Sequence, residues 1–386
     1  MKLLTIIGTR PEAVKMAPVL AKLARRQEIT SLVCATGQHR QLFDDAAFCS
    51  GLTPDFGLRL MEPDQQPAEL QARAIPAIER LLAAERPDRV VVHGDTGSGV
   101  AGARAAHALG IPVSHVEAGL RTHRLDNPWP EEGYRREIDS LADQLFAPTP
   151  LAARHLMDEQ VEGRIFITGN SGVDALHAVL NAMEDDAVLR RNSDATIPPL
   201  PKAKPVVLVT LHRRESIGAP LRRMCGGLRS LAADGMHLVV TLHPNPSVTQ
   251  QLEEELGRRD GIQLVQPFSH PTMVRMMQRA DLIITDSGGV QEEAPSLGTP
   301  VLVAREVTER PEGVALGLAH MIGCCPELMM AQARAALARP IGAAISNPYG
   351  DGAAAERILA GLLGEPFAPF GAPETTGASA PILLVG

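Results

Sequence analysis

The chain has 386 residues, which is too long for one compact core and about the length of two α/β domains. Its formal net charge of −8 argues against a broad nucleic-acid-binding face, and no apolar run approaches the roughly 20 residues of a membrane span. Five cysteines without CxxC spacing indicate reduced thiols rather than disulfides or zinc ligands, so we expect a cytoplasmic protein that binds neither nucleic acid nor membranes.

Short apolar runs alternate with helical patterns along the first half of the chain. Helices are predicted at 10–26, 98–110 and 131–143, and Pro11 suits the first turn of the first one. The apolar runs predict strands within "LLTIIG" (3–8), "SLVCATG" (31–37), "DRVVVHGD" (88–95), "IPVSHVEAG" (111–119), "QLFAPT" (144–149) and "RIFITGN" (164–170).

The same alternation restarts after the proline-rich stretch 197–205. Strands are predicted within "VVLVTLH" (206–212), "HLVVTLHP" (237–244), "IQLVQP" (262–267), "DLIITDSGG" (281–289) and "TPVLVA" (299–304), and a helix at 220–235 follows the first of them. Alternating strands and helices indicate parallel, doubly wound sheets. We therefore predict an α/β protein of two Rossmann-like domains that face each other across a cleft. A last helix is predicted at 350–364, and the tail 365–386, rich in Pro, Ala, Gly and Thr, is predicted to be disordered.

Two of the predicted strands end in turns suited to phosphate groups. The turn "GTRPE" places Arg10 at a helix start, with Lys15 about one turn further on. The Ser-Gly-Gly turn at 287–289 also opens a helix, and Glu293 follows about one turn later, where a carboxylate can bind ribose hydroxyls. Ligands of open parallel sheets bind at the carboxyl ends of strands, where helix N-termini offer N–H groups to anions. Ordinary βα turns would explain the same pattern, so both interpretations stay open.

Acidic residues follow two neighbouring strands. Asp95 ends "VVHGD", Glu117 ends the next strand, and Glu131 follows on a proline-stiffened loop. Neighbouring parallel strands bring their ends to one rim, so these carboxylates can share a cleft. Like charges held close raise one another's pKa, which yields a proton donor and an acceptor side by side. Helix capping explains Glu132 better, and the pattern leaves Glu131 open between the two roles.

Histidines stand at three predicted strand ends, His93, His212 and His243. The spacing His93-x-Asp95 is compatible with a metal, but no ligand spacing such as HExxH accompanies it, so no metal is predicted. No GxGxxG follows any strand, so a nicotinamide cofactor is not supported either. We expect no cofactor.

Ten segments in order resemble the non-hydrolysing UDP-N-acetylglucosamine 2-epimerases over about residues 1 to 360. They are "GTRPEAVKMAP", "GQHR", "VVHGDT", "HVEAGLRT", "PWPEE", "FITGN", "HRRES", "TDSGGVQEEAPSLGTPVLV", "TERPEGV" and "NPYGDG". The resemblance implies a GT-B type fold, with domains at 1–168 and 169–349 and with the helix 350–364 returning to the first domain. It also implies a homodimer.

The implied reaction is the interconversion of UDP-N-acetylglucosamine and UDP-N-acetylmannosamine. UDP is eliminated across C1–C2 to give 2-acetamidoglucal and is then added back with C2 protonated on the other face. The resemblance carries over three sets of residues. Asp95, Glu117, Glu131 and His212 would be catalytic; Arg10, Lys15, His243, Ser287, Gly288, Gly289, Glu293 and Arg310 would bind UDP; and Gln38, His39 and Arg40 would bind an activating second UDP-N-acetylglucosamine.

The chain departs from the family pattern after Asp95. Where many members carry threonines, it reads "DTGSGVAG", and we expect Gly97 and Gly99 to loosen the helix start and to remove sugar contacts. Three alternatives remain: a hydrolysing 2-epimerase that releases N-acetylmannosamine and UDP, a GT-B glycosyltransferase, and a nucleotide-sugar sensor without activity.

Overall fold

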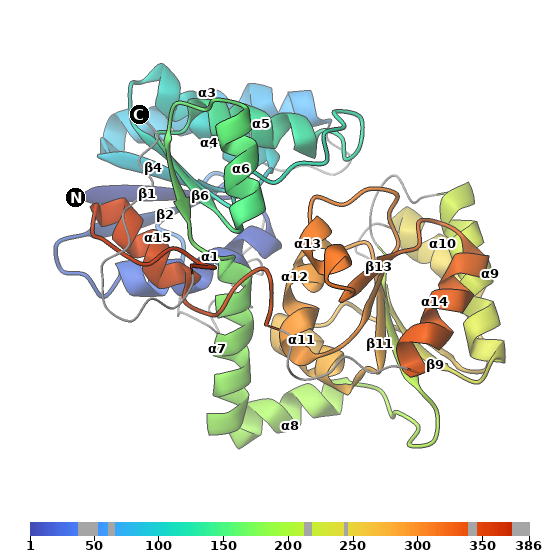
Figure 1. Cartoon of the computed structure of the whole chain (residues 1–386). Helices are drawn as coiled ribbons and strands as arrows, with labels where there is room; N and C mark the ends of the chain where they lie inside the picture. Colours follow the sequence, from blue (N-terminus) through green and yellow to red (C-terminus); the bar gives the residue numbers. More distant parts are fainter. Residues whose placement is uncertain (38–52, 61–65, 212–217, 243–245, 339–345, 373–386) are drawn as a thin grey trace. The chain divides into compact units, whose positions relative to one another are not determined.

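A computed structural model describes residues 1–37, 53–60, 66–211, 218–242, 246–338 and 346–372 (Figure 1). The chain forms two compact units. The first is Met1–Ala178 with Tyr349–Gly386, and the second is Val179–Pro348. This division falls inside the helix that contains Ala178.

The first unit is built on a parallel sheet of seven strands among the described residues, in the order β3-β2-β1-β4-β5-β6-β7. Every predicted strand of this half is present. The strands are β1 (Lys2–Ile7), β2 (Thr30–Ala35), β3 (Phe56–Gly57), β4 (Arg89–His93), β5 (Val113–Val116), β6 (Gln144–Ala147) and β7 (Arg164–Ile167).

Helices cover both faces of this sheet, which explains its nearly continuous apolar strands. Leu4 and Ile6 of β1 pack into one buried cluster, and Leu3 and Ile7 pack into another on the opposite face. The helices are α1 (Arg10–Leu23), α3 (Pro67–Glu85), α4 (Gly97–Ala108), α5 (Glu131–Leu141), α6 (Pro150–Asp158), α7 (Ser171–Asp185) and α15 (Ala354–Leu363).

The C-terminal helix α15 packs beside α1 in the first unit (Figure 1). Lys22 of α1 and Glu356 of α15 form an ion pair at 2.7 Å. The segment after the helix is also placed: the Phe370 N–H donates to the Ile167 carbonyl at 2.9 Å, and Arg357 lies 5.8 Å from the Phe370 ring centroid. Residues 365–372 are therefore packed rather than disordered, because their aromatic side chains find apolar and cationic partners. The rest of the tail lies outside the described residues.

The second unit has a parallel sheet of six strands among the described residues, in the order β10-β9-β8-β11-β12-β13. The predicted strands of this half are all present. The strands are β8 (Val206–Thr210), β9 (His237–Thr241), β10 (Ile262–Val265), β11 (Leu282–Thr285), β12 (Val301–Val303) and β13 (Ala319–Met321).

Helices accompany this second sheet as well. They are α8 (Ala187–Thr196), α9 (Ala219–Ala233), α10 (Pro246–Leu256), α11 (His270–Arg279), α12 (Gly288–Leu297), α13 (Pro311–Ala315) and α14 (Pro326–Ala338). Two doubly wound, Rossmann-like parallel sheets are thus confirmed. Across the parts of the chain that the structure describes, we find no helix with the length and hydropathy of a membrane span.

Asp174 of α7 holds the N-terminus of α15, since its buried carboxylate accepts from the Ala354 and Ala355 N–H groups at 3.1 and 2.8 Å. We expect Asp174→Ala to lower the free energy of unfolding by about 1–3 kcal/mol, because two buried N–H groups lose their acceptor. Thermal unfolding measures the change. Asp185→Ala, an exposed carboxylate at the end of the same helix, is the control, and equal stability of the two variants would contradict this role.

Candidate active site

The carboxyl ends of β1, β4 and β5 form the candidate site of the first unit. The sheet order makes β1 the strand at which the winding reverses, because β2 and β3 lie on one side of it and β4 to β7 on the other. In such sheets ligands bind in the crevice at the carboxyl ends next to this reversal. Arg10 begins α1 directly after β1, Asp95 lies two residues after β4, and Glu117 follows β5.

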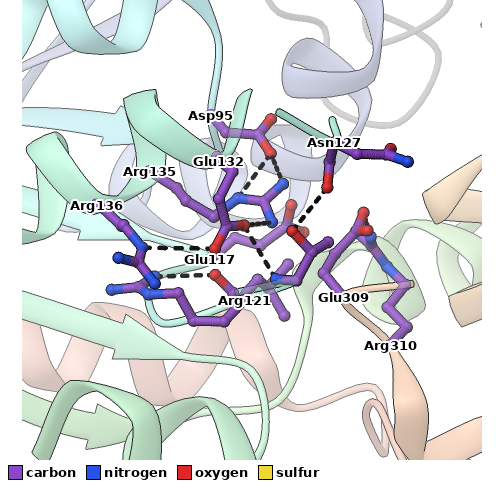
Figure 2. Close-up of polar contacts among 12 residues, drawn as sticks. Asp95, Glu117, Arg121, Asn127, Glu132, Arg135, Arg136, Glu309 and Arg310 are labelled. Carbon is purple, nitrogen blue, oxygen red and sulfur yellow. Dashed lines mark hydrogen bonds and ion pairs between the residues drawn. The ribbon is translucent and has the colours of Figure 1, made fainter. Parts of the chain in front are cut away.

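Asp95 is held by a buried arginine that the sequence did not single out. Arg135 of α5 pairs with the Asp95 carboxylate, to which its Nε also donates at 3.1 Å (Figure 2). The same guanidinium donates to Glu132 at 2.9 Å. Glu132 is fully buried and also accepts from the backbone N–H groups of Thr122 and His123. Glu132 therefore anchors the loop before α5, in line with its expected structural role.

Glu117 sits in strained backbone beside a buried lysine. Its φ of +70° lies in the left-handed region, which costs a non-glycine residue about 1–2 kcal/mol. Its Oε2 pairs with Lys15 Nζ and accepts from Asn170 Nδ2 at 2.7 Å. Lys15, expected among the UDP-binding residues, is thus placed as the counter-ion of Glu117. Strain of this kind concentrates at functional sites.

Asp95 and Glu117 belong to adjacent turns that the structure brings together. A Cβ built on Gly94, the residue before Asp95, would lie 3.7 Å from Glu117 Oε1. His93, at the end of β4, has its Nε2 3.8 Å from Glu117 Oε2. Burial lowers the pKa of His93 to about 4, with Glu117 opposing and Lys15 adding to this shift, so His93 is neutral at pH 7.

Glu131 is the first residue of α5 and is half-buried. Arg135, which pairs with Asp95, lies four residues further along the same helix and hence on the same face. Glu131 therefore begins the same helix that carries Arg135, the partner of Asp95. Trp129, in the loop just before it, is 65% exposed.

The helix after Asp95 is regular in spite of its glycines. Thr96 caps α4 by accepting from the Gly99 N–H at 3.0 Å, and Ser98 Oγ lies 2.5 Å from Thr36 Oγ1. The expectation that Gly97 and Gly99 loosen this helix start is wrong, because the Thr96 cap supplies the acceptor that the first turn needs.

Glu12 joins the turn after β1 to the turn after β4. Its buried carboxylate accepts from the Gly8 and Thr9 N–H groups at 3.1 and 2.6 Å, and from Thr96 Oγ1 at 2.8 Å. Burial raises its pKa from 4.5 to about 7, against the lowering effect of these hydrogen bonds. Glu12 thus connects the turn that carries Arg10 with the turn that carries Asp95.

The second unit has a candidate anion site at its own reversal point. β8 lies between β9 and β11, and the turn Ser287-Gly288-Gly289 after β11 leads into α12, which begins at Gly288. Helix N-termini of this kind bind phosphate through backbone N–H groups. A Cβ on Gly289 would meet no described atom within 4 Å, so this backbone is open to a ligand.

Buried charges surround the start of α12. A Cβ on Gly288 would lie only 2.5 Å from Arg310 Nη1, so only glycine lets this guanidinium approach the turn. Arg310 Nε pairs with Glu292 at 2.6 Å, and its Nη1 pairs with Glu309. Glu293 Oε1 lies 3.5 Å from His270 Nε2. Of the residues expected to bind UDP, Gly288, Gly289 and Glu293 lie in α12, and Ser287 and Arg310 directly precede α12 and α13.

Several expected site residues lie outside the described residues. They are His212, His243, Gln38, His39 and Arg40. In the remainder of the chain, no group of three or more His, Cys, Asp and Glu side chains has the arrangement of a metal site.

Fold and site together define an α/β protein with a carboxylate-rich rim in one unit and an anion-binding turn in the other, as in enzymes that act on nucleotide-linked substrates. The family described as UDP-N-acetylglucosamine 2-epimerase matches residues 21–363. The UDP-N-acetylglucosamine 2-epimerase of Escherichia coli (strain K12) is 41% identical over 369 residues, which are 94% of this chain and 98% of that protein.

Two solved structures agree with this match. The Neisseria meningitidis UDP-GlcNAc 2-epimerase bound to UDP-GlcNAc is 36% identical and superposes with a TM-score of 0.90 over 95% of this chain and all (100%) of that one. The Methanocaldococcus jannaschii enzyme in complex with UDP-GlcNAc and UDP is 31% identical, with a TM-score of 0.84 over 94% of this chain and 99% of that one. The chain belongs to the UDP-N-acetylglucosamine 2-epimerase family.

Glu12→Gln tests the carboxylate that joins the two turns. A carboxyl with a raised folded pKa keeps its proton while the unfolded chain loses it, so the native protein loses stability relative to the variant as pH rises from 4.5 to about 7. We expect a relative shift on the order of 1–3 kcal/mol in urea unfolding between pH 4.5 and 8. Glu69→Gln removes the exposed acid of the corresponding cap of α3 and is the matched control. A difference that is the same at every pH would contradict the assignment.

Proposed function

We propose that this chain interconverts UDP-N-acetylglucosamine and UDP-N-acetylmannosamine without hydrolysis. The single observation that carries the proposal is a pair of carboxylates, Asp95 and Glu117, on adjacent turns at the reversal point of the sheet, each with its own buried cation, in a chain of this family. Proteins of the same family bind UDP-GlcNAc in their crystals, which supports a UDP-sugar as substrate.

The carboxylates suit the proton transfers that C2 inversion needs. In the elimination step, the C2–H bond breaks and its electron pair forms the C1–C2 double bond of 2-acetamidoglucal. The C1–O bond breaks at the same time, and its electron pair leaves on the UDP oxygen. A carboxylate takes the C2 proton. In the return step, a UDP oxygen attacks C1 and a carboxylic acid protonates C2 on the opposite face. We assign Asp95, Glu117 and Glu131 to this set.

The cations beside Asp95 and Glu117 favour the ionised carboxylates that removal of the C2 proton needs. Lys15 and Asn170 stabilise negative charge on Glu117, and Arg135 does so on Asp95. A carboxylate that is ionised before substrate binds can accept the C2 proton directly. Glu131, which is expected to complete the set, begins α5 one turn before Arg135.

The nucleotide half of the substrate is assigned to the second unit together with Arg10. The backbone N–H groups of the Ser287-Gly288-Gly289 turn would bind the diphosphate, which is an anion that helix N-termini favour. Glu293 would accept from ribose hydroxyls, and Arg310 would support the turn from behind Gly288. His212 is assigned to the departing phosphate and His243 to UDP by resemblance to the family.

Product analysis tests the proposal against its alternatives. UDP-N-acetylglucosamine is incubated with the protein in D2O and followed by proton NMR. The expected result is UDP-N-acetylmannosamine with deuterium at C2. Free N-acetylmannosamine with UDP would instead establish the hydrolysing reaction. Binding of UDP without any exchange at C2 would establish a sensor, and turnover that requires an acceptor sugar would establish a glycosyltransferase.

Amide variants test the acid/base set. Asp95→Asn, Glu117→Gln and Glu131→Gln should each lower turnover by about 10²–10⁴-fold, because an amide cannot accept or donate the transferred proton. UDP affinity, measured by calorimetry, should stay close to that of the native protein. Glu184→Gln, an exposed carboxylate of α7, is the control. A triple amide variant that still epimerises would overturn the assignment.

A further inference from the structure

His115 of β5 lies beneath the candidate catalytic turns and is fully buried. Its Nε2 is 2.8 Å from the Gly94 carbonyl oxygen, and its Nδ1 is 2.7 Å from Asp139 Oδ1. Both ring nitrogens therefore face oxygen atoms. A carbonyl oxygen can only accept a hydrogen bond, so Nε2 must carry a proton.

Asp139 of α5 is an ionised acceptor as well. Its other oxygen, Oδ2, lies 2.7 Å from Arg121 Nη1 and accepts from the Gly119 N–H at 3.3 Å. A buried guanidinium and a backbone N–H on the same oxygen favour the ionised form of this carboxylate. An ionised carboxylate cannot donate, so Nδ1 of His115 must also carry a proton.

The charges around His115 balance a cationic ring. Asp139 faces it from α5, and Arg121 reaches Asp139 from the segment after β5. The neutral His93 of β4 pairs in register with Val116 rather than with His115, so it lies on the other face of the sheet. Arg121 in turn pairs with Glu159 at 2.6 Å. Two cations and two anions thus form one buried, hydrogen-bonded group, which is the condition under which buried charges are tolerated.

This group touches all three elements that carry the assigned carboxylates. The Gly94 carbonyl belongs to the peptide that enters Asp95, and Gly94 has a φ of +62°. Gly119 lies two residues after Glu117, and Asp139 lies on the helix that Glu131 begins. A shift of His115 would therefore reach Asp95 through one peptide bond.

We propose that His115 is a positioning residue that is kept as an imidazolium and fixes the Gly94 carbonyl, and through it Asp95, for the epimerisation reaction. This inference rests on the proposed function for its effect on turnover, but its protonation state can be measured independently. The ring touches no part of the substrate in this assignment. Its role is to hold the orientation of a carboxylate that does.

Nitrogen-15 NMR of the native protein measures the protonation state directly. The protein is labelled at its 12 histidines, and His115 is assigned through its own Cβ resonances. Because both ring nitrogens face oxygen atoms, we expect His115 to show both nitrogens protonated under the conditions of the turnover assay. A His115 ring with one unprotonated nitrogen would overturn the proposal, whether or not the protein is an epimerase.

Two amide variants separate the hydrogen bonds of the ring. In His115→Gln the side-chain amide can still donate to the Gly94 carbonyl, whereas in His115→Asn it can donate only to Asp139. We expect His115→Asn to lower kcat by about 10²-fold, as a displaced catalytic group does, with KM and UDP affinity nearly unchanged. His115→Gln should retain most of kcat.

Equal kcat values in two folded variants would overturn the positioning role, and so would a loss confined to KM. If neither variant folds, the NMR measurement on the native protein decides the proposal. A native protein with no turnover would contradict the proposed function while the protonation state of His115 is still measured, so the two failures are distinguishable.

Discussion

The compensation of buried charge is the constraint on which the first unit depends. Glu117 pairs with Lys15, the half-buried Asp95 pairs with the buried Arg135, and Asp139 pairs with Arg121. Moving an ion out of water costs several kcal/mol, and well-packed apolar residues would serve stability as well or better. Three such pairs at one end of one sheet are therefore poorly explained by folding alone. They are explained if Asp95 and Glu117 must be held in fixed orientations at the rim, with the Asp139–Arg121 pair supporting them from within the unit.

Sheet topology decides where this charge can be used. In both units the winding reverses at the strand that comes first in the chain, β1 in one and β8 in the other. The residues that follow the neighbouring strands are the candidate site residues. At the first reversal these residues are acids with cationic partners. At the second they are a Ser-Gly-Gly turn at a helix start, with Arg310 packed behind it. One architecture thus supplies two different kinds of site, because a parallel sheet leaves its strand ends and helix N-termini at the same edge.

The strands and the acids could be predicted from local sequence, but their partners could not. Apolar runs identify β1, β4 and β5, and the acids that follow them are visible by position. Lys15 and Glu117, by contrast, are 102 residues apart, and Asp95 and Arg135 are 40 apart, so no local pattern links them. One signal was available: Glu132, Arg135 and Asp139 recur at helical spacing on a single face of α5, which is unusual for a face that proves to be buried. The sequence prediction that residues 365–372 are disordered was wrong, because composition does not reveal that the Arg357 guanidinium lies over the Phe370 ring.

The left-handed backbone conformation of Glu117 requires contacts that hold it in place. The N–H groups of Glu117 and Ala118 both donate to the Phe146 carbonyl, each at 3.1 Å, so the chain leaves the regular ladder of β5 at this point. The left-handed conformation of Glu117 turns its carboxylate off the line of the strand towards Lys15 and Gly94. Such a conformation persists only where its surroundings hold it on several sides. The Phe146 carbonyl holds it through the backbone, and Lys15 and Asn170 hold it through the side chain. The Asp139 bond to Gly119 holds the residues that follow, so the same buried group that fixes Gly94 also limits how far Glu117 can relax.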